Sequence, residues 1–528
     1  MPDNSATEKS NAIHNTVSVG YGDLDDVDNI ISAVVSPGGR EVVINKNDVD
    51  DAMRYALDAK GVEIDPTFEK KLVRKVDIML LPLIALLMSC QLMDKTTNSY
   101  AALMGFREDL GMTTKGYSWV GSTFYFGYMV FEYPGTMILQ RFPLSKALGI
   151  VVILWGGILM LHAATQNTAG FLILRFILGM FEGMMNPAYM MLVSQWWKKE
   201  EQYMRSCIYV GMQGMGTLIG AGAAYGLYIH RGITGHVFAS WRLFYIITAV
   251  ITIVLGAISL IHIPDIPTKA WFLNDTEKKY IVQRIRGNQQ GFGNHHWKKS
   301  QVYEAFTDIP SYILFIYGFT YALANGGYNN FGSILLNEDF GFDTGQSMLM
   351  NMPGGGIDIV FPPFVAWICY KFLKNHRLVV AIIVNAIVFI GMCLLNFTGH
   401  RGSKLTGYLS FYMATAVLSC MFSIISSNVA GSSKKITVST IYFVGYCVGN
   451  IVGPQTFTTS PYVGAKTAML VSFAVGTGCL TSLLFIYSKR NKDRDAHNAA
   501  LGDKYEVPEN IEFADLTDKE NPEFRYSL

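Results

Sequence analysis

Two opposite charges stand in the middle of a strongly apolar stretch. The segment LRFILGMFEGMMNP, residues 174–187, contains Arg175 and Glu182. In a helix, a spacing of seven residues puts both side chains on one face, about 10 Å apart along the axis. A charge at bilayer depth is costly unless it is paired or faces water. The pair therefore predicts either a charge cluster that locks helices together or the polar lining of a path for a substrate and an ion.

A second polar stripe occurs earlier, in the segment CQLMDKTTNSYAAL, residues 90–103. Asp94, Lys95 and Asn98 stand at helical spacing, so they share one face of an otherwise apolar helix. In the alternative interpretation, Asp94 and Lys95 mark only the outer end of this helix. We favour a position inside the helix because the segment contains neither Pro nor Gly.

Polar groups also occur in several other apolar segments, which favours a conduit over a bundle packed only by apolar contacts. These groups are Tyr125, Glu132, Gln213, Asn325, Asn329, Asn330, Asp358, Asn450 and Gln455. Two of them have structural alternatives. Glu132, two residues before Pro134, would stabilise a kinked helix, and Asp358, after PGGG, would satisfy backbone groups at a broken helix.

The segments that must position these residues are long enough to cross a bilayer. Of the 528 residues, 50% are hydrophobic and only 16% charged, whereas soluble proteins have about 25% charged residues. A membrane-spanning helix needs about 20 mostly apolar residues, and the sequence predicts twelve such helices. They lie near residues 76–101, 117–138, 147–165, 169–192, 206–229, 241–263, 309–331, 346–370, 378–396, 406–428, 436–459 and 466–488.

The order of these helices predicts an all-α membrane protein with two six-helix bundles, as in transporters built from two parallel repeats. Lys and Arg concentrate in the loops and tails of one side, which predicts that both termini are cytosolic. The first 50 residues contain no apolar signal segment, so the first span must direct insertion. The expected parts are a disordered N-terminal tail (1–75), the first bundle (76–263), a cytosolic central loop (264–308), the second bundle (309–488) and a cytosolic C-terminal tail (489–528).

Several motifs resemble one known family. They include MDKTTNSYAALMG, RFILGMFEGMMNP, SQWWKKEEQ, SWRLFY, SSNVAGSSKKITVS and GNIVGPQTF. Over residues 76–490 the chain resembles the anion:cation symporter group of the major facilitator superfamily, most closely its fungal allantoate permease branch. The resemblance implies a twelve-helix transporter that works by alternating access, without enzymatic activity, cofactor or metal. It also implies a monomer in the plasma membrane, with the vacuolar membrane as the alternative.

The resemblance also implies roles for particular residues. In this family an acidic residue followed by a basic one in the first span serves proton uptake and anion recognition; here these are Asp94 and Lys95, although Arg is more common in the second place. An Arg and a Glu in the fourth span, here Arg175 and Glu182, link a proton-binding carboxylate to a cation. Gln213 in the fifth span resembles a substrate contact.

One loop departs from the family pattern. The segment LQRFPLSK, residues 139–146, lacks the acidic residue of the usual G-x-x-x-D-x-x-G-R loop, which leaves Arg141 alone at that gate.

Together these residues predict proton-coupled import of a small organic anion. When ionised, Glu182 is expected to pair with Arg175; when protonated, it would release Arg175 to the substrate. The candidate residues are Asp94, Glu182 and Glu132 for proton coupling; Lys95, Asn98, Tyr125, Arg175, Gln213, Asn329 and Asn450 for substrate binding; and Arg141, Asp358 and Gln455 for gating or structure. The expected substrates are carboxylates such as allantoate and other ureido acids, nicotinate or other vitamins, small peptides and amino-acid derivatives.

The residues fit three other functions less well. A membrane enzyme would need a His with a carboxylate at one membrane face or metal-ligand spacing, and the seven cysteines stand singly in apolar segments. A nutrient receptor would have a large cytosolic tail, whereas these tails are more suited to trafficking control, including recognition by a ubiquitin ligase. A proton-antiport exporter of drugs would have a bulky apolar cavity, whereas Lys95 and Arg175 favour an anion. The net charge of +1 argues against a nucleic-acid partner.

Overall fold

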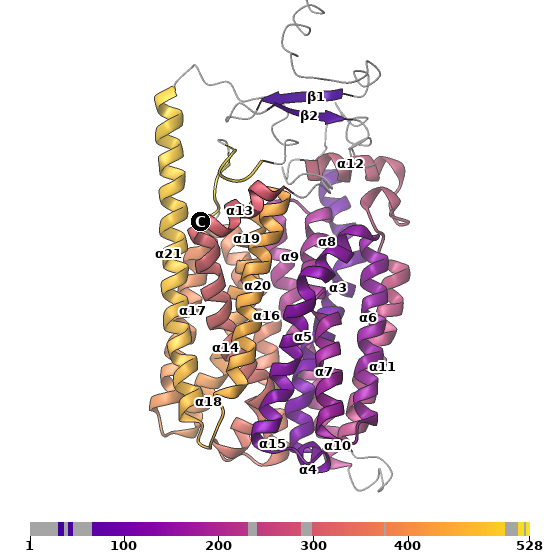
Figure 1. Ribbon diagram of the computed structural model, residues 1–528, viewed down its shortest axis with the longest axis vertical. Helices are drawn as coiled ribbons and strands as arrows, with labels where there is room; N and C mark the ends of the chain where they lie inside the picture. Colours follow the sequence, from indigo (N-terminus) through magenta and orange to yellow (C-terminus); the bar gives the residue numbers. More distant parts are fainter. Residues whose placement is uncertain are drawn as a thin grey trace, which may run out of the picture.

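The computed structural model describes a molecule that is almost entirely helical (Figure 1). The described residues are 30–35, 41–45, 66–230, 240–286, 298–373, 376–501, 516–521 and 524–528. Strands β1 (Ile30–Val35) and β2 (Glu41–Asn45) form an antiparallel pair. The remainder of the predicted N-terminal tail before Pro66 lies outside the described residues.

The first half of the bundle begins with a helix longer than the predicted first span. Its long helices are α3 (Pro66–Leu103), α5 (Thr114–Arg141), α6 (Leu144–Leu161), α7 (Thr168–Glu182) continued by α8 (Met185–Trp196), α9 (Lys199–Gly211) continued by α10 (Gln213–Ile229), and α11 (Ser240–His262). The short helices α4 (Phe106–Asp109) and α12 (Asp275–Arg286) lie beside them, whereas α13 (Lys299–Thr307) packs against the second half.

The second half repeats this pattern. Its helices are α14 (Ile309–Glu338), α15 (Thr344–Leu349) continued by α16 (Met352–Phe372), α17 (Arg377–Phe397), α18 (Arg401–Ser410) continued by α19 (Thr415–Asn428), α20 (Ser432–Gln455) and α21 (Val463–Leu501). The segment between α18 and α19, Phe411–Ala414, is a turn of 3-10 helix.

Nine of the described helical segments are long and apolar enough to cross a membrane. Three further long segments, formed by α5, by α9 with α10, and by α14, run alongside them (Figure 1). Together they are consistent with the predicted twelve-helix fold. These three segments carry several of the polar residues discussed below, including Glu132 and Asn329.

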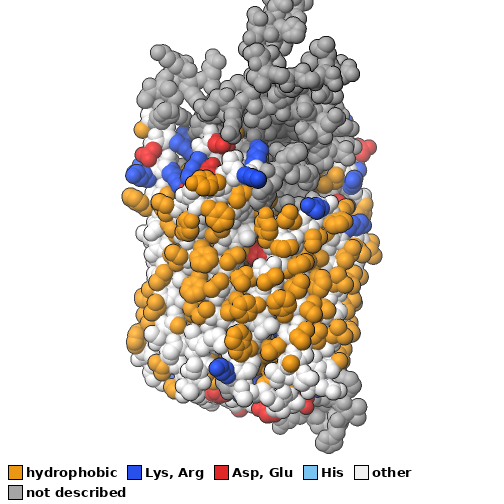
Figure 2. All heavy atoms as spheres, viewed as in Figure 1, with side chains coloured by type: hydrophobic (Ala, Val, Ile, Leu, Met, Phe, Trp, Pro, Cys, Tyr) orange, Lys and Arg blue, Asp and Glu red, His pale blue; other side chains and the backbone are white. Residues whose placement is uncertain are grey.

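The molecular surface matches a lipid environment. On the face shown in Figure 2, hydrophobic side chains cover the broad middle of the bundle, while most charged side chains lie toward its two ends. Several large apolar side chains are open to the surroundings, such as Ile261 at 82% and Phe397 at 77% exposure. In a bilayer such residues face acyl chains, and the helices satisfy their own backbone groups.

The two ends of the bundle can be told apart by their short helices. We call the end that carries α12, α13 and the end of α21 the terminal end, and the end that carries α4 and α15 the far end (Figure 1). Helix α21 continues well past the predicted last span, which ended at residue 488, and reaches Leu501.

Glycines allow the helices within each half to approach closely. A Cβ atom on Gly179 of α7 would lie 1.9 Å from the carbonyl oxygen of Phe124 of α5. In the second half, a Cβ atom on Gly449 of α20 would lie 2.2 Å from the carbonyl oxygen of Phe319 of α14. Such contacts suit membrane helices, where close backbone packing drives association.

The Gly179→Ala substitution should therefore destabilise the first half by about 1–3 kcal/mol, because the added methyl group would meet a backbone atom that cannot rotate away. Thermal unfolding of the purified protein in detergent measures this effect. The matched control is Gly157→Ala in α6, because a Cβ atom there would have no neighbour within 4 Å. Equal melting temperatures for the two variants would contradict the close α5–α7 contact.

Candidate functional site

A buried ion pair joins the first and fourth spans. The Nζ atom of Lys95 in α3 lies 2.8 Å from Oε1 of Glu182, the last residue of α7. The side chain of Lys95 is 10% exposed and that of Glu182 is 0% exposed. The predicted pairing of Glu182 with Arg175 is therefore wrong. Two residues seven apart share a helix face but stand about 10 Å apart along the axis, whereas the long stem of Lys95 reaches across from the neighbouring helix.

Arg175 instead has neutral partners. Its Nη2 atom donates hydrogen bonds to the hydroxyl of Tyr245, at 2.7 Å, and to Oδ1 of Asn98. Tyr245 in α11 also donates to Oδ1 of Asn98, at 2.6 Å. The guanidinium carbon of Arg175 lies 5.4 Å from the centre of the Phe171 ring. Arg175, which is 1% exposed, thus ties α3, α7 and α11 together.

Asp94 is the fourth charged residue in this buried region. It is fully buried, and α3 continues beyond it as far as Leu103, so Asp94 and Lys95 do not mark the end of the helix. The carboxylate of Asp94 interacts electrostatically with Glu182, Arg175 and Lys95. Two carboxylic acids and two basic groups therefore lie together in the interior of the first half. We call Asp94, Lys95, Arg175 and Glu182 the charge cluster.

Glu132 is a third buried acid in the first half. It lies in α5, is 2% exposed, and interacts electrostatically with Tyr128 and with Cys447 of α20. Among the described residues it has no ion-pair partner. Glu132 therefore stands where the two halves meet, outside the charge cluster.

Asp358 has a local partner in the second half. Its Oδ1 atom accepts a hydrogen bond from the Thr415 hydroxyl at 2.6 Å, which links α16 to α19. The alternative role of Asp358 at a broken helix does not apply after PGGG, because α16 runs from Met352 to Phe372 without a break there. The carboxylate instead bonds to a side chain of the neighbouring helix.

Two predicted substrate-binding residues, Asn450 and Tyr125, are linked through Tyr446 at the contact between the halves. Asn450 of α20, which is fully buried, accepts a hydrogen bond through Oδ1 from Nδ2 of Asn325 at 3.0 Å. The same Nδ2 group donates to the hydroxyl of Tyr446 at 3.1 Å. The ring of Tyr446 lies edge to face against that of Tyr125 of α5, with centroids 6.1 Å apart.

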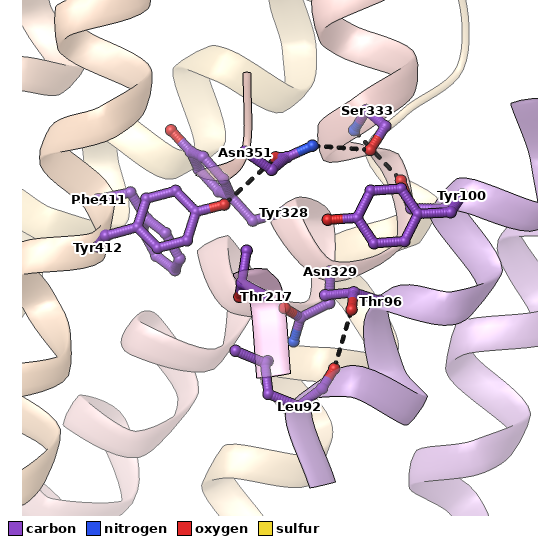
Figure 3. Close-up of a pocket in the computed structure, with 11 residues that line it drawn as sticks. Leu92, Thr96, Tyr100, Thr217, Tyr328, Asn329, Ser333, Asn351, Phe411 and Tyr412 are labelled. Atoms are coloured by element: carbon purple, nitrogen blue, oxygen red, sulfur yellow. Dashed lines mark hydrogen bonds between the residues drawn. The ribbon is translucent and has the colours of Figure 1, made fainter. Parts of the chain in front are cut away.

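A polar cavity lies between the two halves. Its free volume is about 20 Å³, room for about one water molecule, so a larger substrate would fit only after the halves move apart. Figure 3 shows the hydroxyl and amide groups of Tyr412, Asn351 and Ser333 as a hydrogen-bonded row along one side. The lining residues are Leu92, Thr96, Ser99 and Tyr100 of α3, Thr217 of α10, Tyr328, Asn329 and Ser333 of α14, Asn351, Phe411 and Tyr412.

The cavity and the charge cluster share helix α3 but use different faces of it, because Leu92, Thr96, Ser99 and Tyr100 line the cavity and consecutive helical residues do not face each other. Thr96, which lines the cavity, follows Lys95 directly, and Ser99 follows Asn98. Asn329 is part of the lining, as predicted from its position in the seventh span. Gln213 begins α10 one turn before Thr217 and is partly exposed. Asn98, by contrast, is engaged with Arg175.

The halves also contact each other at the far end. The hydroxyl of Tyr117 in α5 donates to the carbonyl oxygen of Asn330 at 2.8 Å. Ser122 donates to the carbonyl oxygen of Ile451 at 2.8 Å and accepts from Nε2 of Gln455 at 2.9 Å. Gln455, a predicted gating residue, thus joins α20 to α5 across the halves.

The terminal end has its own contact between the halves. The hydroxyl of Ser426 in α19 donates to Oε1 of Gln202 in α9 at 2.9 Å. Arg141, predicted to hold a gate alone, is the exposed last residue of α5, and no ion pair of it occurs among the described residues.

The Tyr117→Phe substitution should weaken the far-end contact. It removes a hydrogen bond to the carbonyl of Asn330, which still accepts a backbone bond within α14, at a cost of about 0.5–1.5 kcal/mol. A cysteine placed at Ser333 in the cavity should then react with a membrane-impermeant thiol reagent from the far side about fivefold faster or more. Tyr370→Phe, at an exposed position of α16, is the matched control. An unchanged labelling rate would mean that this contact does not hold the far end closed.

Comparison with known proteins agrees with this architecture. Residues 84–454 match the model of the Major Facilitator Superfamily. The chain belongs to this superfamily. It is 41% identical over 512 residues to the allantoate permease of Saccharomyces cerevisiae, which covers 94% of each chain. It is also 41% identical over 483 residues to an uncharacterized transporter of Schizosaccharomyces pombe, over 91% of this chain and 94% of that one. The allantoate permease branch proposed from the motifs is thus confirmed.

A solved structure shows the same fold. The proton:xylose symporter of the major facilitator superfamily superposes with a TM-score of 0.62 at 13% identity, over 79% of this chain and 96% of that one. The protein is therefore a multi-pass membrane transporter of the major facilitator fold, and not an enzyme.

Sequence reasoning did not single out Tyr245 or Tyr446. Tyr245 holds both Arg175 and Asn98, yet a lone tyrosine in an apolar helix has no periodic signal. The motif SWRLFY contained Tyr245 but did not indicate its contacts.

Proposed function

We propose that this transporter imports a small organic anion together with protons by alternating access. The observation that carries the proposal is the Lys95–Glu182 ion pair, buried in the first half on α3, the helix that also lines the cavity between the halves. Such a pair couples a proton to an anion: when Glu182 binds a proton, Lys95 loses its partner and can bind the carboxylate of a substrate. This assigns to Lys95 the role that the sequence alone assigned to Arg175.

The remaining residues support this exchange. Arg175 is held by neutral partners, so it supplies a fixed positive charge near Asp94 and Glu182. Asp94 and Glu132 are further acids that could carry a proton. One proton per monoanion would be electrically neutral, whereas a second proton would let the membrane potential contribute about 2.3 kcal/mol per 100 mV.

When the halves separate and the cavity widens, its lining would suit a substrate with uncharged polar groups beside its carboxylate. Hydroxyls of Thr96, Ser99 and Tyr412 and amides of Asn329 and Asn351 line the space. These groups can donate to and accept from amide, ureido or heteroaromatic nitrogen and oxygen atoms. Ureido acids such as allantoate, the substrate named for the yeast relative, therefore lead the expected substrates, with nicotinate-like vitamins and small peptides next.

The proposed orientation places the terminal end in the cytosol. Lys and Arg concentrate in the connections at that end, as the positive-inside rule requires. The proposed location is the plasma membrane, where the protein would act as a monomer on its substrate and protons.

The function is tested by uptake of a labelled panel of these anions into cells that express the protein, at pH 5 and pH 7.5, with and without a protonophore. Uptake that is faster at pH 5 and abolished by the protonophore supports the proposal and identifies the substrate. No uptake by a protein that reaches the cell surface would overturn import and favour a receptor. Net efflux driven by the proton gradient would favour an exporter.

A further inference from the structure

The C-terminal residues return to the terminal end of the second half. Residues 516–521 and 524–528, which we call the C-terminal segment, pack beside α13 and α20 (Figure 1). Several of its side chains are as buried as those of the bundle core: Thr517 is 0%, Asp518 2% and Tyr526 4% exposed. Such burial is not expected of the cytosolic tail that the sequence predicts.

Asp518 makes the central contact. Its Oδ1 atom lies 2.6 Å from Nζ of Lys434 in α20, a lysine that is only 1% exposed. The Tyr526 hydroxyl donates to Oδ2 of the same carboxylate at 2.7 Å. The Tyr526 ring stacks on that of Tyr487 in α21, with centroids 5.0 Å apart. The segment thus binds through one buried charge and one buried aromatic ring.

The charged residues of the bundle at this site also pair with one another. Lys434 also pairs with Glu304, at 2.7 Å, and with Asp308, at 3.5 Å. Arg490 of α21 pairs with Asp308 at 2.5 Å. Burial alone would raise the pKa of Asp308, but the Arg490 hydrogen bond and the neighbouring lysines hold it below its usual value, so Asp308 stays ionised.

If the segment left this site, no buried charge of the bundle would therefore be left unpaired. It would remove Asp518 together with Lys519, which pairs with Asp308 at 3.1 Å. The binding surface would keep two cations and two carboxylates: Lys434, Arg490, Glu304 and Asp308. Removing one partner of a buried pair is costly only when the other is left unpaired. The segment is thus held by specific contacts but can leave without breaking the bundle.

The segment also contacts the helix that closes the terminal end. Asn428, the last residue of α19, donates through Nδ2 to the carbonyl oxygen of Ser527 at 2.9 Å and accepts from the Ser527 N–H at 2.8 Å. Two residues earlier, Ser426 makes the contact to Gln202 of the first half. One helix end therefore contacts both the C-terminal segment and the opposite half.

We propose that the terminal end of the second half is a binding site for the chain's own C-terminal segment, and that docking of this acidic and aromatic peptide keeps the α9–α19 contact closed. Its release loosens the end of α19 and lets the halves separate at the terminal end. The segment then sets how readily the transporter opens on that side. This inference does not depend on the substrate or on proton coupling.

The test uses the full-length protein in lipid nanodiscs and two readouts. Hydrogen exchange of the peptide that covers residues 516–528 reports docking. The labelling rate of native Cys207 reports the α9–α19 contact, because this fully buried thiol in α9 lies beside the Ser419 hydroxyl of α19.

Two variants should release the segment: one changes a residue of the segment, and the other changes a residue of the bundle that binds it. Asp518→Asn removes the carboxylate charge that pairs with Lys434 but leaves Lys434 with Glu304 and Asp308, so the bundle should stay folded. Asn428→Ala removes both bonds to Ser527. The matched control is Asp493→Asn, at an exposed position of α21.

Both variants should speed exchange of the C-terminal segment at least tenfold and raise Cys207 labelling severalfold, while the control matches the wild type. Unchanged exchange in both variants would overturn the binding site. Faster exchange with unchanged Cys207 labelling would overturn its control of the α9–α19 contact. If either variant fails to fold, truncation after Leu501 replaces it and Cys207 labelling is its only readout: a severalfold faster rate supports the proposal, and an unchanged rate overturns the control of the α9–α19 contact.

Discussion

Replacing Lys95 with alanine should abolish uptake and lower the free energy of unfolding by about 3–5 kcal/mol, the usual cost of removing one partner from a buried ion pair. Glu182 is fully buried and has Lys95 as its partner at 2.8 Å. The variant would leave this carboxylate in the apolar interior without its cation. It would also remove the cation proposed to bind the substrate. Thermal unfolding in detergent and uptake at matched surface expression measure the two effects.

A second substitution separates stability from function. The double variant Lys95→Ala with Glu182→Gln has no unpaired charge at this position, so it should regain most of the lost stability and still fail in uptake. Lys115→Ala, at an exposed position of α5, is the matched control. Normal uptake by a stable Lys95→Ala protein would exclude Lys95 as the substrate's cation.

The Glu182→Gln variant should lose concentrative uptake but keep exchange of substrate across the membrane. Glutamine cannot bind and release a proton, so Lys95 would stay without its ionised partner in every step. A gradient of two pH units can drive about a hundredfold accumulation for each coupled proton. In the variant, internal substrate should only equilibrate with the external substrate, and this is measured as the accumulation ratio with and without an imposed pH gradient.

The control for this variant is Glu108→Gln, which changes an exposed glutamate of α4 in the same way. It should accumulate substrate like the wild type. If Glu182→Gln protein at normal surface levels concentrates substrate normally, Glu182 is not the coupling residue and the role passes to Asp94 or Glu132.

Much of the fold follows from the sequence because bilayer physics leaves few alternatives. Apolar length predicted the helices, and helical spacing correctly placed Asp94, Lys95 and Asn98 inside one of them. Both inferences need only the periodicity of a single helix.

The pairing of side chains across helices could not be predicted in this way. Arg175 and Glu182 share a face of α7, but their partners depend on which neighbouring side chains reach that face and at what height. Lys95 reaches Glu182, and Tyr245 reaches Arg175, because of the positions of α3 and α11 in space. Periodicity within one helix contains no information on those positions.

The C-terminal segment was missed for a related reason. Its composition is polar, and polar tails are commonly disordered. Its burial depends on a lysine and a tyrosine, Lys434 and Tyr487, that stand in two separate helices of the bundle. Only the three-dimensional arrangement shows that these two residues form one surface for Asp518 and Tyr526.

The central claim is that Glu182 exchanges a proton as Lys95 exchanges an anion. It is tested most directly by measuring proton and substrate fluxes together in proteoliposomes, with the substrate identified from the uptake panel. The account predicts that adding substrate to wild-type proteoliposomes makes the external medium more alkaline as substrate enters, and that Glu182→Gln proteoliposomes exchange substrate without this change. Substrate entry into wild-type proteoliposomes with no accompanying proton movement would contradict the account.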